Sequence, residues 1–450
     1  MMKLYRLAFL LVALLPIAQL HAQTANKSKS MDSLLIAYHK LGRFTGTALI
    51  TKGGKTVYQK SYGYKNTARK TKDDANTIYQ IGSVTKTFTS TMILLLQEQE
   101  KLNVKDKLSK YFPTFPDGDK ITIEHLLTHT SGIYNYTEDT LFERSGMMKH
   151  QSREDMIALF KDKMPANAPG EAFSYSNSNY MLLGYIIEDL TGKTYHQALR
   201  DMILKPLGMK NTGTNFAGLQ SPHKATGYFA IDGDKGAVAP VVDSSVSYAA
   251  GAIYSTVGDL DKWAQAVMAQ KLLRPVDWIM ATKPNKENYG YGWMSGDIYG
   301  KKSLGHNGGI HGFLSNLFMI PQDSVAIILL SNNMTSDLGT IRRDLAAILY
   351  EKAYEIPEVK VEVKLPAATL KEYIGVYQLA PTFEIKVFMD GEKLMAQATN
   401  QNPFQLFAER KDFFFLKVVD AQIGFIRDEN NQIIKLMLHQ GGRVLPGLKK

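Results

Sequence analysis

The spacing of apolar residues changes along the chain, and the changes place the expected strands and helices. In residues 46–64, apolar and polar positions alternate on either side of Gly53-Gly54, which predicts a β-hairpin. Residues 302–332 contain a second pair of strand patterns, and a helical pattern follows at about 337–354. Residues 104–215 alternate helical patterns with loops. We therefore predict an α/β (α+β) fold, in which an antiparallel β-sheet from both ends of this region is flanked by helices and carries an inserted helical subdomain.

A second pattern begins after residue 354 and indicates a smaller domain. Residues 355–369 contain two prolines and are typical of a linker. Residues 370–450 carry short alternating strands with hairpin turns, one of them at Asp390-Gly391. The sequence thus predicts a main domain over residues 31–354 and a small, all-β, barrel-like domain over 370–450.

The first 22 residues have the features of a secretory signal peptide. Lys3 and Arg6 precede an apolar run of about 14 residues, and Ala22 would supply the cleavage site. A spanning helix needs roughly 20 apolar residues, so this run is too short for a membrane anchor. The chain contains no cysteine to carry a lipid at the cleavage site. We expect cleavage after Ala22, no transmembrane segment in the mature chain, and export to the periplasm or the medium.

Composition describes an ordinary globular protein and narrows its partners. Of 450 residues, 44% are hydrophobic and 21% are charged, which is enough apolar material for a sizeable core. The absence of cysteine excludes disulfides, thiolate nucleophiles and thiolate metal sites. The net charge of +10 comes from scattered basic residues, which favours a solvated surface, with weak attraction to anionic cell-envelope polymers as the alternative. We expect no nucleic-acid partner for an exported chain.

Ser83 and Lys86 stand three residues apart at the start of an apolar helical run. Residues at this spacing share one helix face, so the amine would lie beside the hydroxyl. A serine needs a neighbouring base to become a nucleophile, and a buried lysine loses its proton readily. The pattern alone is weak, because Ser221 and Lys224 repeat it in a proline-containing loop.

A series of motifs in a fixed order decides between the two copies. Residues 32–352 contain in succession IGSVTKTFTS, HLLTHTSGI, YSNSNYMLLGYIIEDLTG, PLGMKNT, STVGDLDKW, YGYGW and GHNGGIHGF. This arrangement resembles the serine β-lactamase and penicillin-binding-protein superfamily. It is most similar to the class C β-lactamase-like branch, which includes D-Ala-D-Ala carboxypeptidases, D-amino-acid peptidases and esterases. The resemblance implies a β-lactamase/transpeptidase-like fold, with no cofactor and no metal.

The resemblance also implies the catalytic roles. Ser83 would be the nucleophile that forms an acyl-enzyme, and Lys86 would help to deprotonate it. Tyr175 would carry the proton to the leaving group and later activate water. A tyrosine with a pKa near 10 is a base at neutral pH only when cations lower that pKa. We expect Lys86 and a partly charged His306 to do so.

Four further residues match substrate-binding positions of the family. Asn177 would hydrogen-bond the amide side chain of the substrate, and His306 begins the third motif, His306-Asn307-Gly308. The backbone N–H groups of Ser83 and Gly309 would form the oxyanion hole. Most β-lactamases have lysine where His306 stands, and a histidine is charged only part of the time near neutral pH. The substitution therefore weakens the expectation of efficient β-lactam hydrolysis.

These residues lead to one main hypothesis and two alternatives. The main hypothesis is an exported, penicillin-binding serine acyl hydrolase acting on D-amino-acid peptides of the cell-wall type, or on esters or amides. The alternatives are a true β-lactamase and a non-catalytic receptor for peptidoglycan or β-lactams. His125 and His129 have a zinc-compatible spacing but lack the glutamate of a metalloprotease motif, which argues against a metal site. The resemblance instead implies that they belong to a structural loop near the site. The aromatic residues of 289–293 are assigned to packing, with a pocket-shaping role as the alternative.

Overall fold

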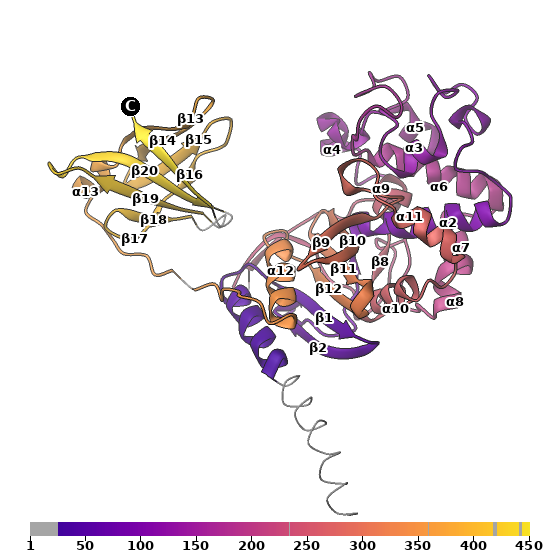
Figure 1. Cartoon of the computed structure of the whole chain (residues 1–450), viewed down its shortest axis with the longest axis horizontal. Coiled ribbons are helices and arrows are strands. Elements are labelled where there is room, and N and C mark those ends of the chain that lie inside the picture. Colours follow the sequence, from indigo (N-terminus) through magenta and orange to yellow (C-terminus); the bar gives the residue numbers. More distant parts are fainter. Residues whose placement is uncertain (1–25, 234, 359, 417–420, 441–442) are drawn as a thin grey trace, which may run out of the picture. The chain divides into compact units, whose positions relative to one another are not determined.

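The computed structural model describes residues 26–233, 235–358, 360–416, 421–440 and 443–450. The predicted signal peptide lies outside these residues. The chain divides into two compact units with a boundary between Pro357 and Glu358 (Figure 1). Of the helices within the described ranges, none is both long and apolar enough to span a bilayer.

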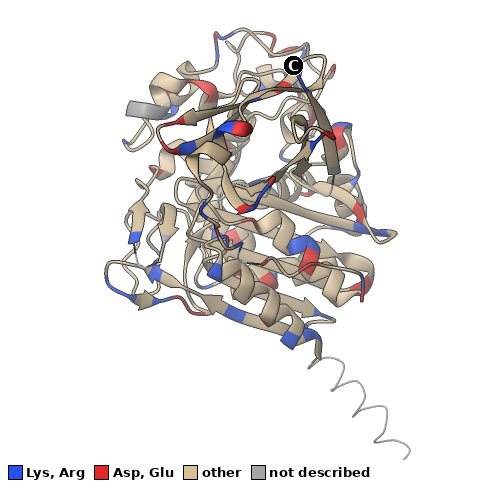
Figure 2. Ribbon diagram, turned by 90° about the vertical axis from the view of Figure 1, so that its left-hand side faces the viewer, with Lys and Arg blue, Asp and Glu red and all other residues tan. Residues whose placement is uncertain are grey.

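Charged residues of both signs are interspersed along the ribbon (Figure 2). Lysine and arginine total 53 residues against 43 aspartates and glutamates. Arg153 and Asp189, for example, form a paired contact with N–O distances of 2.7 and 2.8 Å on the surface of the first unit. Such exposed pairs contribute little to stability and are consistent with a solvated surface.

The first unit is built on a six-stranded antiparallel sheet in the order β2-β1-β12-β11-β10-β9. Its strands are β1 (Gly46–Lys52), β2 (Lys55–Tyr62), β9 (Met294–Ile298), β10 (Lys301–Ile310), β11 (Phe313–Ile320) and β12 (Val325–Ser331). The β1–β2 hairpin turns at Gly53-Gly54, and β1 pairs with β12 from Gly46↔Ser331 to Lys52↔Val325. The sheet therefore joins the two ends of the unit, and the predicted fold class is confirmed.

The central strand β12 is apolar on both faces because two layers cover it. Val325, Ile327 and Leu329 point into a core shared with the helix over residues 26–40 and with α12 (Leu338–Leu349). The intervening residues, such as Ile328, point into the larger core on the opposite face. Successive strand residues alternate between faces, so the unbroken apolar run of β12 fills both cores. Figure 1 shows α12 on one side of the sheet and α10 (Val257–Met268) on the other.

The remaining elements of this unit form the helical part and its connections. The helices are α2 (Thr85–Glu98), α3 (Ile123–Leu127), α4 (Thr140–Ser145), α5 (Arg153–Ala158), α6 (Asn177–Thr191), α7 (Tyr195–Leu199), α8 (Lys205–Leu207), α9 (Ser244–Gly251) and α11 (Pro275–Thr282). Short 3-10 turns are η1 (Gly82–Val84), η2 (Leu108–Lys110), η3 (Tyr136–Glu138), η5 (Lys286–Asn288) and η6 (Pro321–Asp323), and η4 (Arg200–Leu204) is π-helical. Short strands are β3 (Tyr64–Asn66), β4 (Thr71–Lys72), β5 (Tyr79–Gln80), β6 (Tyr228–Asp232), β7 (Lys235–Val238) and β8 (Tyr254–Ser255). The helix α2 runs through the core, where Phe88 stacks on Trp263 with ring centroids 4.4 Å apart.

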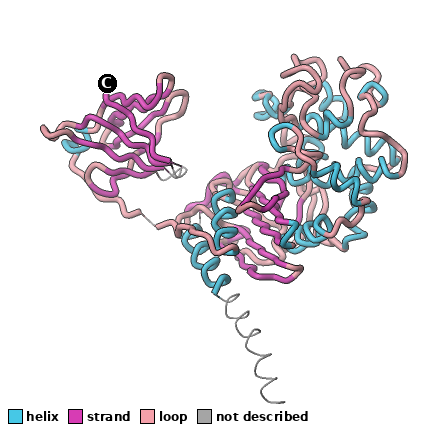
Figure 3. Tube along the Cα trace, viewed as in Figure 1, coloured by secondary structure: helices cyan, strands magenta, loops and turns pink. Residues whose placement is uncertain are grey.

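The second unit is a nine-stranded antiparallel sheet preceded by α13 (Ala367–Glu372). Figure 3, in which strands are magenta, shows that this unit consists mainly of strands. Its strands are β13 (Gly375–Ala380), β14 (Phe383–Asp390), β15 (Lys393–Ala398), β16 (Phe404–Gln405), β17 (Phe407–Arg410), β18 (Phe413–Phe415), β19 (Ala421–Arg427), β20 (Ile433–Gln440) and β21 (Arg443–Lys449). The edge strands of the sheet are β16 and β17, and only Leu406 separates them in the sequence. The sheet must therefore curl until its edges approach each other, which gives the predicted barrel-like, all-β domain.

Candidate active site

Ser83 and Lys86 meet at the start of α2. Ser83 lies in the 3-10 turn η1, and Lys86, one turn later, is fully buried. The Lys86 Nζ donates to Ser83 Oγ at 3.1 Å, to Asn177 Oδ1 at 2.7 Å and to the Ala250 carbonyl at 2.8 Å. Three acceptors therefore satisfy the three N–H bonds of the ammonium form.

This arrangement determines where Lys86 carries its lone pair after losing a proton. Burial holds the pKa of Lys86 well below its usual range. The carbonyl oxygen of Ala250 and the Oδ1 of Asn177 can only accept hydrogen bonds, so two N–H bonds stay with them. The freed lone pair of the neutral amine then faces Ser83 Oγ. The geometry thus makes Lys86 a base for Ser83.

Tyr175 is the second group on the nucleophile, because its hydroxyl donates to Ser83 Oγ at 2.8 Å. Its ring lies 4.9 Å from the Lys86 Nζ. Burial raises the pKa of Tyr175 above its usual value near 10, while its hydrogen bond with Ser83 Oγ lowers it by less. The expectation that neighbouring cations lower this pKa was wrong, because desolvation outweighs them. Tyr175 is therefore a protonated donor in the resting site.

Asn177 begins α6 and holds the lysine as well as lining the site. While its Oδ1 accepts from Lys86, its Nδ2 donates to Thr137 Oγ1 at 3.2 Å and to Asn135 Oδ1 at 3.4 Å. These contacts fix which end of the amide faces Lys86. The predicted contact with a substrate amide would have to share a side chain that is already hydrogen-bonded at both ends.

The strand β10 brings the third motif against η1. Gly82 has a φ of +49°, and a Cβ placed on it would lie 2.7 Å from the backbone nitrogen of Gly309. A Cβ on Gly308 would lie 2.0 Å from the Ile81 carbonyl oxygen. Glycine at these positions lets the backbones of Ser83 and Gly309 approach each other, as an oxyanion hole requires.

His306 is buried and neutral. It is 4% exposed, and its Nδ1–H donates to the Asn307 carbonyl at 2.6 Å. Its Nε2 therefore accepts from the Tyr289 hydroxyl at 2.9 Å. Burial, with a smaller contribution from the charge of Lys86, lowers the pKa of His306 to about 3. The expectation of a partly charged His306 was wrong, because burial penalises the imidazolium form.

The neutral state of His306 predicts how stability depends on pH. Below about pH 6.5 the unfolded chain binds a proton at His306, whereas the native state stays neutral down to about pH 3. The unfolded state then binds more protons, so this group lowers the free energy of unfolding as the pH falls from 6.5 towards 3. In urea unfolding, His306→Asn should flatten the dependence between pH 6 and 4.5 by up to about 1.4 kcal/mol per pH unit. Identical pH slopes for the variant and the wild type would contradict the neutral assignment.

The repeated motifs elsewhere form no comparable group. Lys224 Nζ donates to the Ala217 carbonyl, and no hydrogen bond joins it to the side chain of Ser221. His125 takes part in the N-terminal capping box of α3, in which it exchanges hydrogen bonds with Thr122. In the described part of the chain, no three His, Cys, Asp or Glu side chains are grouped to hold a metal ion.

Three contributions to this site were not assigned from the sequence. The Ala250 carbonyl binds Lys86 through the backbone, which no side-chain pattern reveals. Tyr289 belongs to the motif that we assigned to packing, and its hydroxyl also donates to His306 Nε2. His129 packs against the Tyr175 ring with centroids 4.2 Å apart. For Tyr289 and His129, the position of their motifs in the recurring order was the available signal.

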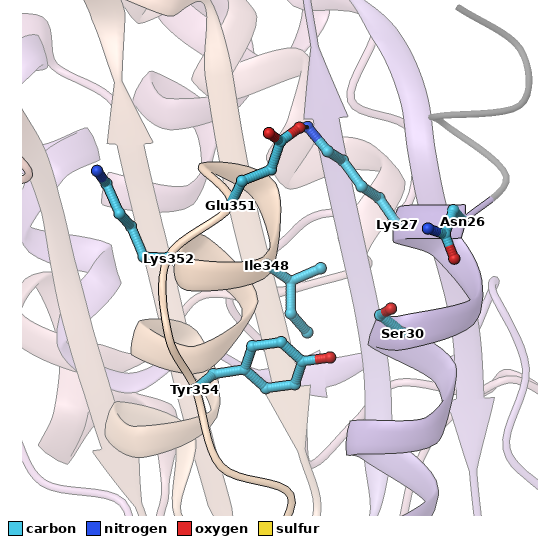
Figure 4. Close-up of a pocket in the computed structure, with 7 residues that line it drawn as sticks. All are labelled: Asn26, Lys27, Ser30, Ile348, Glu351, Lys352 and Tyr354. Carbon is cyan, nitrogen blue, oxygen red and sulfur yellow. Dashed lines mark ion pairs between the residues drawn. The ribbon is translucent and has the colours of Figure 1, made fainter. Parts of the chain in front are cut away.

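Two cavities lie away from Ser83. One of about 340 Å³ lies between the first turn of the helix over 26–40 and the end of α12, where Lys27 Nζ pairs with Glu351 at 2.8 Å (Figure 4). The other, of about 430 Å³, is lined by residues of α5, α6, α7 and α9, including Glu188 and Tyr248. Neither includes Ser83, Lys86 or Tyr175 among its lining residues.

Known proteins match both units. Residues 31–351 match the Beta-lactamase family, and residues 359–445 match a domain of unknown function, DUF3471. A penicillin-binding protein of Bacillus subtilis (strain 168) is 27% identical over 430 residues, which cover 90% of this chain and 95% of that protein. An octameric penicillin-binding protein homologue from Pyrococcus abyssi superposes with a TM-score of 0.68 at 26% identity, covering 93% of this chain and 99% of that one. A D-stereospecific amidohydrolase from Streptomyces sp. gives a TM-score of 0.61 at 26% identity, covering 74% and 99%.

Proposed function

Because the chain belongs to the beta-lactamase family, we propose that it is an exported serine hydrolase that cleaves amide or ester bonds of D-amino-acid substrates through an acyl-enzyme on Ser83. One observation carries this proposal. Ser83 Oγ is hydrogen-bonded at once by the Lys86 amine, at 3.1 Å, and by the Tyr175 hydroxyl, at 2.8 Å. A base and a proton donor on one hydroxyl are what acyl transfer to serine requires.

The acylation step follows from these contacts. Neutral Lys86 takes the proton of Ser83 as Ser83 Oγ attacks the substrate carbonyl carbon, and the developing oxyanion binds the N–H groups of Ser83 and Gly309. Tyr175 O–H then protonates the leaving amine or alkoxide as the scissile bond breaks. The Lys86 ammonium then gives its proton to the Tyr175 phenolate, which restores both groups. Water later enters in place of the leaving group, and the same groups act in reverse to release the acid and free Ser83.

The electrostatics of the site favour substrates without a carboxylate over penicillins, which carry one. His306 occupies the position where most β-lactamases have lysine, yet it is uncharged and hydrogen-bonded within the protein on both ring nitrogens. It therefore supplies no permanent cation for the carboxylate of a penicillin or of a peptide terminus. The D-stereospecific amidohydrolase among the similar structures supports amides as the substrate class. A non-catalytic receptor would not need both Lys86 and Tyr175 on Ser83.

The proposal is tested with the chain lacking residues 1–22. A fluorescent penicillin should label the protein, and peptide mass mapping should place the adduct on Ser83. D-phenylalanine amide and a p-nitrophenyl ester should be turned over, with L-phenylalanine amide as the matched control and a chromogenic cephalosporin as the antibiotic substrate. Preference for the L-amide would overturn the stereochemical part. A lack of labelling and turnover with every probe would overturn the hydrolase.

Export has its own test. We expect the full chain, expressed in a bacterium, to be recovered outside the cytoplasm with Gln23 as its first residue, because Ala22 would end the signal peptide. N-terminal sequencing of the fractionated protein checks this. Ala22→Arg, which places a large cation at the cleavage site, should leave the precursor uncut. Recovery of a cytoplasmic chain that begins at Met1 would contradict export.

A further inference from the structure

His129 has two costly features that the mechanism above leaves unused. It follows the last turn of α3 with a φ of +54°, a left-handed conformation that strains a residue other than glycine by about 1–3 kcal/mol. Its side chain is completely buried, and Nε2 has no hydrogen-bond partner among the described residues. A buried donor left without a partner costs a further 1–3 kcal/mol or so. Strain of this kind points to a function when the contacts of the residue converge on a reactive group.

The contacts of His129 converge on the segment that carries Tyr175. The N–H of Ser174 donates to the carbonyl of His129 at 2.8 Å, and the N–H of Ser176 donates to its Nδ1 at 3.1 Å. The His129 and Tyr175 rings pack with centroids 4.2 Å apart and planes inclined by 37°. One histidine thus binds the residue before Tyr175, the residue after it and the ring itself.

The orientation of the His129 ring is fixed from the other side. Ser131 Oγ donates to Asn179 Oδ1 at 2.6 Å, which turns the Asn179 Nδ2 towards His129 Nδ1 at 3.3 Å. Nδ1 therefore accepts from both neighbours, and the ring proton resides on Nε2. Burial, with a smaller contribution from the charge of Lys86, holds the pKa of His129 well below its usual range. The ring stays neutral, so Nδ1 remains an acceptor.

Tyr175 needs such support because its hydroxyl has one hydrogen bond among the residues that the structure describes, the bond to Ser83 Oγ. No second partner fixes the hydroxyl, so its place follows from the ring and the backbone. The Tyr289 ring also packs against the His129 ring, with the two centroids 4.9 Å apart. We propose that His129 is a positioning residue that holds the Tyr175 hydroxyl on Ser83, an inference that rests on the proposed hydrolase.

Three substitutions separate the contacts of His129. His129→Gly relieves the left-handed strain and removes the acceptor and the ring. His129→Leu fills the space but also lacks the acceptor. His129→Asn tolerates the left-handed conformation and offers Oδ1 to the N–H of Ser176 without an aromatic ring. A displacement of about 1 Å in a catalytic group can cost 10²-fold, so we expect the glycine and leucine variants to lose about 10- to 100-fold in kcat with little change in KM. The asparagine variant should recover most of this loss.

Coupling to Tyr175 distinguishes positioning from general structural support. Each variant is made in the wild type and in Tyr175→Phe, and two rates are measured: turnover of a p-nitrophenyl ester, and labelling of Ser83 by a fluorophosphonate. We expect His129→Gly to slow both rates in the wild type and to change them less than twofold in Tyr175→Phe. Equal losses in the two backgrounds, or wild-type rates in His129→Gly, would overturn the inference. If the leucine variant does not fold, the strain-free glycine variant still decides the test. Absence of wild-type turnover and labelling would instead count against the hydrolase.

Discussion

Replacing Lys86 by methionine should slow the acylation of Ser83 by about 10³- to 10⁴-fold, the upper range for loss of a positioned general base. Methionine matches the length of the fully buried lysine stem, so the helix α2 should keep its packing. What disappears is the amine whose lone pair faces Ser83 Oγ. The measurement is the rate of ester turnover and of fluorescent-penicillin labelling, with circular dichroism to confirm folding.

Lys86→Arg is the matched control, because it separates charge from basicity. Arginine keeps a positive charge near Ser83 but stays protonated at every working pH, so it cannot accept the proton of Ser83. We expect the arginine variant to be as slow as the methionine variant. In the wild type, the acylation rate should rise with pH through the lowered pKa of Lys86, because the deprotonated amine is the active form. An active arginine variant would mean that Lys86 acts by its charge.

Replacing Gly308 by alanine should damage both the fold and the site. The new Cβ would lie 2.0 Å from the Ile81 carbonyl oxygen and 2.3 Å from Ser315 Oγ, which donates to that oxygen at 2.7 Å. The strand β10 would have to move away from the residue that leads into η1. We expect the free energy of unfolding to fall by about 1–3 kcal/mol. Acylation should slow by about 10²–10³-fold as the two oxyanion donors separate.

Gly309→Ala provides the control on the same strand. Its Cβ would meet Leu314 Cδ2 at 3.6 Å, an ordinary contact, and its φ lies outside the left-handed region. Urea unfolding should therefore place this variant within about 0.5 kcal/mol of the wild type, well above Gly308→Ala. Equal destabilisation by the two substitutions would show that the approach of β10 to Ile81 does not limit stability.

The sequence predicted the fold class because its periodicities are local. The hairpin at 46–64 follows from alternation and turn residues alone and belongs to the observed sheet. The expectation of two strands in 302–332 was wrong, because the structure has three, β10, β11 and β12. The missed turn lies between β10 and β11, where Gly312 has a φ of +81°. The pairing of β1 with β12 was accessible only as an inference from strands at both ends of the unit. The helix expected at about 337–354 is α12, Leu338–Leu349, since helix ends depend on capping and packing rather than on period.

The catalytic residues of the site could also be predicted from the spacing and order of the motifs. Ser83 and Lys86 lie one helical turn apart, so their contact is a property of the local sequence. Tyr175 was placed by its motif, and the structure brings its hydroxyl to Ser83. The charge of His306 could not be predicted in this way. It depends on burial and, to a smaller extent, on the charge of Lys86, which lies far away in the sequence, and both are products of the fold.

The sequence by itself determined which chemical groups are present, their order, and the fold class that carries them, because these follow from residue identity and short-range spacing. The tertiary structure alone decided their protonation states and their mutual positions. Desolvation depends on everything packed around a group, and the partners of Lys86, Tyr175 and His129 come from segments far apart in the chain. Ser221 and Lys224 have the same spacing as Ser83 and Lys86. They lack such surroundings, and Lys224 Nζ donates instead to the Ala217 carbonyl.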